Sequence, residues 1–190
     1  PHNLIRLELG KEYPEDGPAV NRYTRAAEAL TEWIRTGVMI REQIPAYYLV
    51  EHKFSRWGQE TSYWGLVAAV RLEDFESGEI RPTEIVMKGP VADRLQLLRS
   101  CKANLSPIMA VYRRNEPILS LFPEVDPANP TVSATDDDGV TFNLHVIADE
   151  ARNKQVTDFF ARTPLYIADG HHRYTTALAY RNEQPEKDYN

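Results

Sequence analysis

Cysteine is nearly absent from this sequence, with Cys101 as its single copy. One thiol excludes an internal disulfide and a zinc site built from several cysteines. It gives no reason to place the protein outside a reducing compartment, so we expect a cytoplasmic location. Long hydrophobic runs are also lacking, because the most apolar stretch, residues 63–72, falls well short of the ~18 residues of a membrane-spanning helix. We therefore expect no membrane partner.

Positive charge is the next shortage. Lysine and arginine number 22 against 28 aspartates and glutamates, which gives a net charge of −6. Such a surface repels polyphosphate, so nucleic acid is a disfavoured partner unless a local basic patch exists. Aromatic residues are plentiful, with 3 Trp, 10 Tyr and 6 Phe, and 42% of all residues are hydrophobic. This composition excludes a disordered, collagen-like or coiled-coil chain.

The length of 190 residues fits one domain spanning residues 1–190. The chain opens on Pro1 rather than methionine, and its last residues come directly after a helical pattern. We therefore expect the sequence to be a segment of a longer chain.

Hydrophobic periodicity predicts a mixed α/β (α+β) fold, because helix and strand patterns alternate along the chain. We expect the 46–54 and 62–72 strands to be joined by a longish polar loop and the 107–112 strand to be buried. The proline-rich 117–130 passage, in which only Ile118–Phe122 is helix-like, is expected to be a surface connection. An Asp-Gly turn at 136–139 predicts a hairpin, and its acids are better explained by a solvated turn than by calcium. The expected helices are 18–36, 90–103, 149–163 and 174–184, and the expected strands are 46–54, 62–72, 80–87, 107–112, 131–135, 140–147 and 165–168.

One tract carries a clear chemical signal. Residues 164–168 have strand character, Asp169-Gly170-His171-His172-Arg173 follows, and a helix then resumes. A helix start offers backbone N–H groups without partners and the positive end of the macrodipole, and glycine lets a ligand approach closely. Arg173 can clamp two phosphate oxygens. We predict a polyphosphate site here, with Asp169 on a magnesium ion that accompanies the nucleotide.

The same residues also fit different roles. One of the adjacent histidines can be structural, and Asp169 can be only a helix cap. A transition-metal site on Asp169, His171 and His172 would instead support a metal-dependent hydrolase. Lys88, Asp93 and Arg94 can line the phosphate side or form an ordinary solvated helix start. Four residues are assigned to packing or surface positions rather than chemistry: His2, His52, His145 and Cys101.

Several tracts together resemble a known family. They are Asn21-Arg22-Tyr23-Thr24-Arg25-Ala26-Ala27, Gly89-Pro90, Asp93-Arg94-Leu95, Ala103-Asn104-Leu105-Ser106-Pro107-Ile108 and the tract from Ile167 to Tyr174. The chain resembles, over essentially its whole length, the prokaryotic family catalogued as domain of unknown function 1015. That family's members are longer at both ends, and its name supplies no activity.

A remoter resemblance does supply an activity. Asp-Gly-His-His-Arg after a strand is similar to the nucleotide-binding motif of the free-serine kinases in the ParB/sulfiredoxin superfamily. Their order of a His-Glu pair, a helix and a Pro-Ile-Val strand before the motif is matched here by Thr83-Glu84, the 90–103 helix and Pro107-Ile108, with residues 113–163 as an insertion. Thr83 departs from the pattern, which has histidine there.

This resemblance implies a ParB/sulfiredoxin-like core, about 80–112 plus 164–182, with an N-terminal helix and hairpin and an inserted hairpin and helix. It also implies that Glu84 is the base, that Asp169 supports the metal, and that Gly170, His171, His172 and Arg173 contact the phosphates of ATP or ADP with Mg²⁺.

The expected function is accordingly a phosphotransferase acting on a small hydroxyl-bearing metabolite, with free serine as the leading candidate. A nucleotide-responsive regulatory module without phosphotransfer is the alternative from another class. The kinase hypothesis needs Glu84 and Asp169 to face one cavity, and it needs the imidazoles and guanidinium of the motif to face a ligand.

Overall fold

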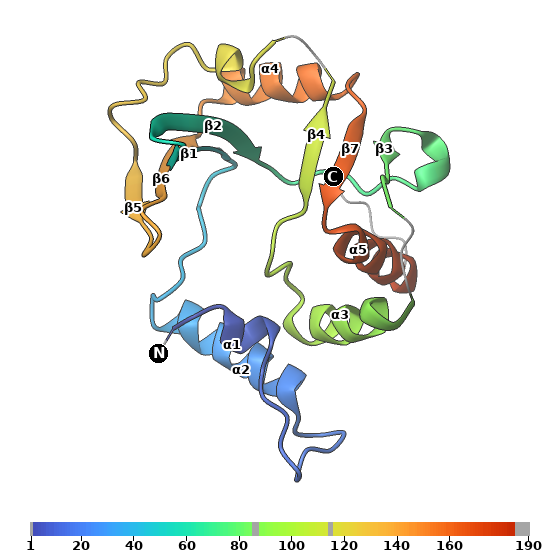
Figure 1. Cartoon of the computed structure of the whole chain (residues 1–190). Coiled ribbons are helices and arrows are strands. Elements are labelled where there is room, and N and C mark those ends of the chain that lie inside the picture. Colours follow the sequence, from blue (N-terminus) through green and yellow to red (C-terminus); the bar gives the residue numbers. More distant parts are fainter. Residues whose placement is uncertain (1, 85–87, 114–115, 185–190) are drawn as a thin grey trace. The chain divides into compact units, whose positions relative to one another are not determined.

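The computed structural model describes residues 2–84, 88–113 and 116–184, and within these the chain is a mixed α/β protein with five α-helices and two small sheets. It forms two compact units (Figure 1). The first unit is built from residues 1–41, 72–111 and 165–190, and the second from residues 42–71 and 112–164. The α-helices are α1 (Ile5–Glu8), α2 (Arg22–Arg35), α3 (Lys88–Cys101), α4 (Glu150–Phe160) and α5 (His171–Glu183). The strands are β1 (Tyr47–Arg56), β2 (Gln59–Val67), β3 (Ile80–Arg81), β4 (Met109–Tyr112), β5 (Val132–Thr135), β6 (Thr141–Ile147) and β7 (Leu165–Asp169).

Helix α2 confirms the first predicted helix and shows why it begins where it does. The side chain of Asn21 accepts hydrogen bonds from the backbone N–H groups of Tyr23 and Thr24, at 3.0 and 3.1 Å. The Thr24 hydroxyl accepts the Asn21 N–H in return, at 3.0 Å, which completes a capping box. The buried side of α2 packs in a core of the first unit that contains Leu7, Ala26, Leu30, Trp33 and Leu97.

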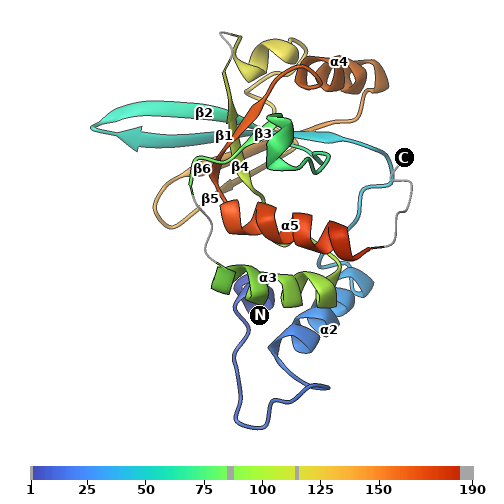
Figure 2. The same cartoon turned by 90° about the vertical axis from the view of Figure 1, so that its right-hand side faces the viewer.

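The first unit also contains the three-stranded sheet β3-β7-β4. Its core cluster joins Ile80 and Ile167 from the strands to Tyr174 and Leu178 from α5. The expectation of a buried strand at 107–112 is wrong, because Met109 and Val111 of β4 are 55% and 46% exposed. β4 lies at the edge of its sheet, so one long side of it has no neighbouring strand within the described residues. Helices α3 and α5 lie side by side (Figures 1 and 2).

The second unit is a four-stranded antiparallel sheet in the order β2-β1-β6-β5. The expected long loop between β1 and β2 is wrong, because only Trp57 and Gly58 separate the strands. Both residues adopt positive φ angles, 53° and 74°, as a tight two-residue hairpin turn requires. The β5–β6 hairpin is confirmed, and the Asp136 carboxylate accepts backbone N–H groups within its turn.

The core of the second unit also corrects a prediction. Ile118 and Phe122 are buried together with Leu49, Ile147 and Val156, although the 117–130 passage was expected to be only a surface connection. A short 3-10 helix after Pro117, spanning Ile118–Leu121, brings these apolar side chains onto one face of the sheet. The predicted cap of α4 is confirmed, since Asp149 accepts the Arg152 N–H at 2.7 Å. Of the helices described, none has the length and apolar character needed to cross a bilayer.

Candidate functional site

The sequence motif at the start of α5 meets the Thr83-Glu84 pair at one edge of the three-stranded sheet. Strands β3 and β7 are parallel, with Ile80 opposite Leu165. Thr83-Glu84 follows β3, and Gly170 follows β7. Since the carboxyl ends of parallel strands share one edge of a sheet, residues 84 positions apart in the chain become neighbours, as the bond from the Thr83 hydroxyl to the Ile167 carbonyl shows.

His171 lies at the centre of this meeting point. It is 4% exposed, and its Nε2 accepts the backbone N–H of Thr83 at 3.0 Å. The Thr83 hydroxyl donates to the Ile167 carbonyl at 2.8 Å and lies 3.1 Å from the same Nε2. Because a backbone N–H can only donate, Nε2 is the unprotonated nitrogen, and the ring proton of the neutral imidazole is on Nδ1.

The protonated side of this imidazole faces Glu84. The distance from His171 Nδ1 to Glu84 Oε2 is 3.7 Å, and the Glu84 side chain is 71% exposed. A buried imidazole of fixed tautomer therefore lies beside a carboxylate that is itself open to solvent, at a distance longer than a hydrogen bond. Such a carboxylate can receive a proton from a bound hydroxyl group.

Arg173 joins the other parts of the motif. Its guanidinium forms an ion pair with Asp169 and donates a hydrogen bond to the Pro107 carbonyl just before β4. Gly170, with φ of 92°, lies against it: a Cβ at this position would be 3.0 Å from Arg173 Nε. The close approach explains the glycine, because any side chain would push the guanidinium away.

The start of α5 has the features of an anion site. Gly170 occupies the N-cap position and provides no side-chain hydrogen bond to the helix. The N–H groups of the first helical residues have no intrahelical acceptor, and the first such bond runs from Tyr174 N to the Gly170 carbonyl. These amides and the Arg173 guanidinium, whose side chain is 31% exposed, lie at the same helix end.

The structure distinguishes between the two adjacent histidines. His171 is engaged with Thr83 through its ring, so its backbone N–H rather than its imidazole points to the helix start. His172 has a buried Nε2 with no hydrogen-bond partner in the described part of the chain. Both imidazoles were expected to contact phosphate. In the structure the ring of His171 is bonded to Thr83, and Nε2 of the His172 ring is buried.

The described residues form no transition-metal site. Within residues 2–84, 88–113 and 116–184, no three His, Cys, Asp or Glu side chains converge as metal ligands. The alternative of a hydrolase metal on Asp169, His171 and His172 therefore lacks its ligand set. Magnesium needs fewer protein ligands, because it takes one or two carboxylates and completes its coordination shell with phosphate oxygens and water. Asp169 fits that role, since its side chain is 71% exposed and is anchored through Oδ2.

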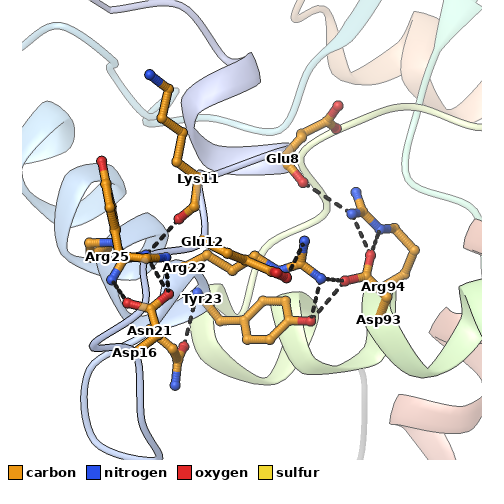
Figure 3. A network of polar contacts seen from close by, with 11 residues as sticks. Glu8, Lys11, Glu12, Asp16, Asn21, Arg22, Tyr23, Arg25, Asp93 and Arg94 are labelled. Atoms are coloured by element: carbon orange, nitrogen blue, oxygen red, sulfur yellow. Dashed lines mark hydrogen bonds and ion pairs between the residues drawn. The ribbon is translucent and has the colours of Figure 1, made fainter.

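Asp93 and Arg94 do not join this site. They belong to a polar network that ties α3 to α2 and α1 (Figure 3). Asp93 accepts the Tyr23 hydroxyl at 2.8 Å and Arg94 Nε at 2.7 Å, and it also pairs with Arg22. Burial acts to raise the pKa of Asp93, but hydrogen bonds from Tyr23 and Arg94 and the charges of Arg94 and Arg22 hold it below its ordinary value.

A second arginine pair extends the network in Figure 3. Arg25 pairs with Asp16 at 2.5 Å and donates to the Lys11 carbonyl at 2.6 Å, while Arg22 also reaches Glu12 at 3.1 Å. The sequence singled out these arginines only as carriers of family resemblance. In this structure Arg22 joins α2 to α3 through Asp93, and Arg25 joins α2 to the segment that precedes it through Asp16 and Lys11. The signal that could have revealed it is the pairing of adjacent charged residues on two amphipathic helices.

The residues assigned to packing behave as such. Cys101 is half-buried against the first unit's core, and burial raises the pKa of its thiol, which disfavours the reactive thiolate. His145 is 5% exposed, and His52 stacks on Tyr63 with ring centroids 4.4 Å apart. Burial lowers the pKa of His52, so the neutral imidazole is favoured there.

Comparison with known proteins identifies a family and no activity. The model of the family described as "Protein of unknown function (DUF1015)" matches residues 1–190. Neither the curated proteins nor the solved structures contain a match to the chain.

Proposed function

Because the chain belongs to the DUF1015 family, whose description states no activity, we propose its function from the site: a nucleotide-dependent phosphotransferase that acts on a small hydroxyl-bearing metabolite. The observation that carries the proposal is the convergence of Glu84, Pro107 and Asp169–Arg173 at one edge of the sheet. The resemblance to free-serine kinases implies site roles for Glu84 and for Asp169–Arg173, and it matches Pro107 to the start of the strand that precedes the motif. Free serine is the leading candidate for the acceptor.

The proposed nucleotide is ATP or ADP, with its phosphates at the start of α5. The backbone N–H groups of His171, His172 and Arg173 and the Arg173 guanidinium would contact phosphate oxygens. Gly170 leaves room for this approach because it has no side chain. Asp169 would hold Mg²⁺, which, when bound, supplies positive charge against the phosphate oxygens.

Glu84 is the proposed base. It would accept the proton of the acceptor hydroxyl, whose oxygen then bonds to the terminal phosphorus while the nucleotide leaves with one phosphoryl group fewer. His171 would be a positioning residue, since its Nδ1–H side lies 3.7 Å from the Glu84 carboxylate. In the kinases a histidine directly precedes the glutamate, whereas this chain has Thr83 there. His171 would then supply the imidazole beside Glu84 from another part of the chain. Thr83 would act by fixing the tautomer of that imidazole.

We also propose that β3, α3, β4, β7 and α5 form a core of the ParB/sulfiredoxin type. Support comes from the order of these elements, a strand, a helix, a strand and then the motif between strand and helix. The remaining elements would be an N-terminal elaboration by helix α2 and the β1–β2 hairpin, and an insertion of the β5–β6 hairpin with helix α4.

A direct test incubates the chain with Mg²⁺, ATP or ADP, and either serine or a mixture of hydroxyl-bearing metabolites. Mass spectrometry then looks for a phosphorylated product, and calorimetry measures nucleotide binding. We expect product formation to fall at least about 100-fold in Glu84→Gln, with nucleotide binding retained. Asp169→Asn is expected to lose both product formation and magnesium-dependent nucleotide binding.

The matched control is Glu150→Gln, which removes the same charge from an exposed position in the first turn of α4. It is expected to leave both measurements unchanged. Nucleotide binding without any product would favour the regulatory module over the phosphotransferase. Absence of nucleotide binding would overturn both.

A further inference from the structure

The four-stranded sheet of the second unit has two unlike faces. One face packs on the core that contains Leu49, Ile147 and Val156. Strand register places a different set of side chains on the opposite face, which we call the open face. Its residues are Tyr48, Val50, His52, Phe54 and Arg56 from β1; Gln59, Thr61, Tyr63, Gly65 and Val67 from β2; Phe142, Leu144 and Val146 from β6; and Val132 and Ala134 from β5.

The open face is apolar and partly exposed. Tyr63 is 49% exposed, Val67 45% and Val132 54%. His52 lies in its middle, with its ring 4.4 Å from that of Tyr63 and 4.7 Å from that of Phe142. A continuous apolar sheet face of this kind is typical of an interaction surface rather than of a solvated sheet.

Charge is confined to one end of this face. Among its strand residues, all of which lie in the described part of the chain, Arg56 is the one with a fixed charge. Its guanidinium lies over the ring of Trp57 in the β1–β2 turn, 4.2 Å from the centroid. The β5–β6 turn carries the opposite charge on Asp136, Asp137 and Asp138.

The two turns occupy the same end of the sheet but opposite edges. β6 is antiparallel to β1, with Tyr47 opposite Ile147 and Lys53 opposite Thr141, so β6 begins at the end where β1 finishes. Figure 2 shows both turns extending toward the same side. The strand order β2-β1-β6-β5 places the β1–β2 hairpin, with Arg56 on the open face, along one edge and the β5–β6 hairpin with its aspartates along the other.

We propose that the open face binds a second copy of this chain in a two-fold symmetric dimer, with the axis parallel to the strands. A half-turn about such an axis exchanges the edges of the sheet and keeps its ends. The β1–β2 hairpin of each copy therefore lies over the β5–β6 hairpin of the other. Arg56 of one copy faces the partner's Asp137 and Asp138, and the same contact occurs a second time by symmetry.

The apolar part of the face suits the same arrangement. Val67 and Val132 are at opposite edges, in adjacent rows of the open face that are two residues apart along the strands, so each comes close to the partner's other valine. Two sheets packed face to face lie about 10 Å apart and bury both sets of side chains. A nucleic acid is a poorer occupant, because the three aspartates of the β5–β6 turn would repel its phosphates.

The test measures the mass of the whole chain in solution by light scattering and by sedimentation over a range of concentrations. We expect twice the chain mass of 21.8 kDa at the higher concentrations. Val132→Glu places a charge in the apolar contact and is expected to give monomer throughout. Arg56→Glu is expected to weaken association at least about tenfold, with a smaller loss at high salt.

A charge exchange makes the test specific for a second copy. Asp137→Lys with Asp138→Lys is expected to weaken the dimer, and combining both with Arg56→Glu is expected to restore it. Asp136 is left unchanged because its carboxylate holds the turn. The control, Ser55→Glu, places a charge on the opposite face of the same strand and is expected to leave the mass unchanged.

Far-UV circular dichroism of each variant shows that the mass change does not come from unfolding. A monomer mass at every concentration would overturn the proposal and would indicate another occupant for the open face. A dimer that Val132→Glu and Arg56→Glu both leave intact would overturn it as well, since the dimer would then use another surface.

Discussion

The two units of this chain are held together in different ways. In the first unit, directional polar contacts join residues far apart in the sequence, such as Thr83 with His171 over 88 positions and Arg22 with Asp93 over 71. In the second unit, strand register and one apolar cluster around Leu49 organise the chain. The first unit thus depends on specific side-chain partners, whereas the second depends mainly on pattern.

This difference separates two kinds of potential function. Polar groups that meet at a sheet edge in the first unit can bind and orient a charged ligand. The second unit also buries polar groups, since the Glu51 carboxylate accepts from Asn143 at 2.9 Å and pairs with Lys53 at 3.2 Å. These groups satisfy one another within the sheet, and the surface that remains available is apolar. Chemistry is therefore proposed for the first unit and association for the second.

The largest expected effect comes from the apolar core of the second unit. Leu49 is fully buried, so Leu49→Ala is expected to cost about 2–5 kcal/mol of unfolding free energy. Hydrogen exchange followed by peptide should show loss of protection in residues 42–71 and 116–164, with the first unit retained. Val70→Ala, at a 52% exposed position of the second unit that lies outside the open face, is the control and should change little. Equal loss of protection in both units would contradict the view that each unit is stabilised by its own set of contacts.

The second largest loss of stability is expected from a change in the polar network of the first unit. Asp93→Asn removes the charge that Arg22 and Arg94 share and is expected to cost about 2 kcal/mol. The native pKa of Asp93 lies below its ordinary value of 3.8, so the unfolded state binds the proton first as the pH falls. Its contribution is complete above that ordinary value and is lost as the pH falls through the native pKa.

Urea unfolding at several pH values measures this linkage. The wild-type chain should lose stability below about pH 4 more steeply than Asp93→Asn does. Asp158→Asn, at an exposed position of α4, is a control that keeps the wild-type slope. Identical slopes in wild type and Asp93→Asn would show that the network contributes no charge-dependent stability.

A smaller effect is expected at the motif glycine. Gly170→Ala imposes a positive φ on a residue with a side chain and places a methyl group 3.0 Å from Arg173, at a cost of about 1 kcal/mol. The displaced guanidinium should weaken nucleotide binding more than it lowers stability. Calorimetry and thermal unfolding compare the two, and Gly139→Ala, also at a positive φ but with open space around it, is the control. Equal nucleotide affinity in both variants would remove Gly170 from the proposed site.

Much of the fold could be predicted from local signals. The α2 helix, the β5–β6 hairpin and the Asp149 cap follow from periodicity, an Asp-Gly turn and a capping residue. The errors arose where the tertiary structure overrides local preference. Trp57 adopts a positive φ that a tryptophan rarely takes, and a proline-rich passage places Phe122 in the core.

The candidate site could be predicted only in part. The anion-binding character of Asp169–Arg173 follows from a strand, a glycine and a helix start, all contiguous in the chain. The contact of His171 with Thr83 depends on the parallel pairing of β3 with β7. A strand was expected at 80–87, of which residues 80–81 form β3 and 85–87 lie outside the described residues, but its own sequence does not reveal which strand it pairs with. The resemblance to the kinases suggested that Glu84 belongs near the motif, but it did not reveal the imidazole between them.

The smallest expected effect belongs to an exposed ion pair of the second unit. Lys154 and Asp158 lie one turn apart on α4, 2.7 Å from each other, with side chains 74% and 63% exposed. Lys154→Ala is expected to change the unfolding free energy by less than about 0.5 kcal/mol, because solvent and salt screen the pair. Thermal unfolding at low and high salt measures it. A loss comparable to that of Asp93→Asn would mean that polar contacts matter equally in both units, and the contrast between them would no longer hold.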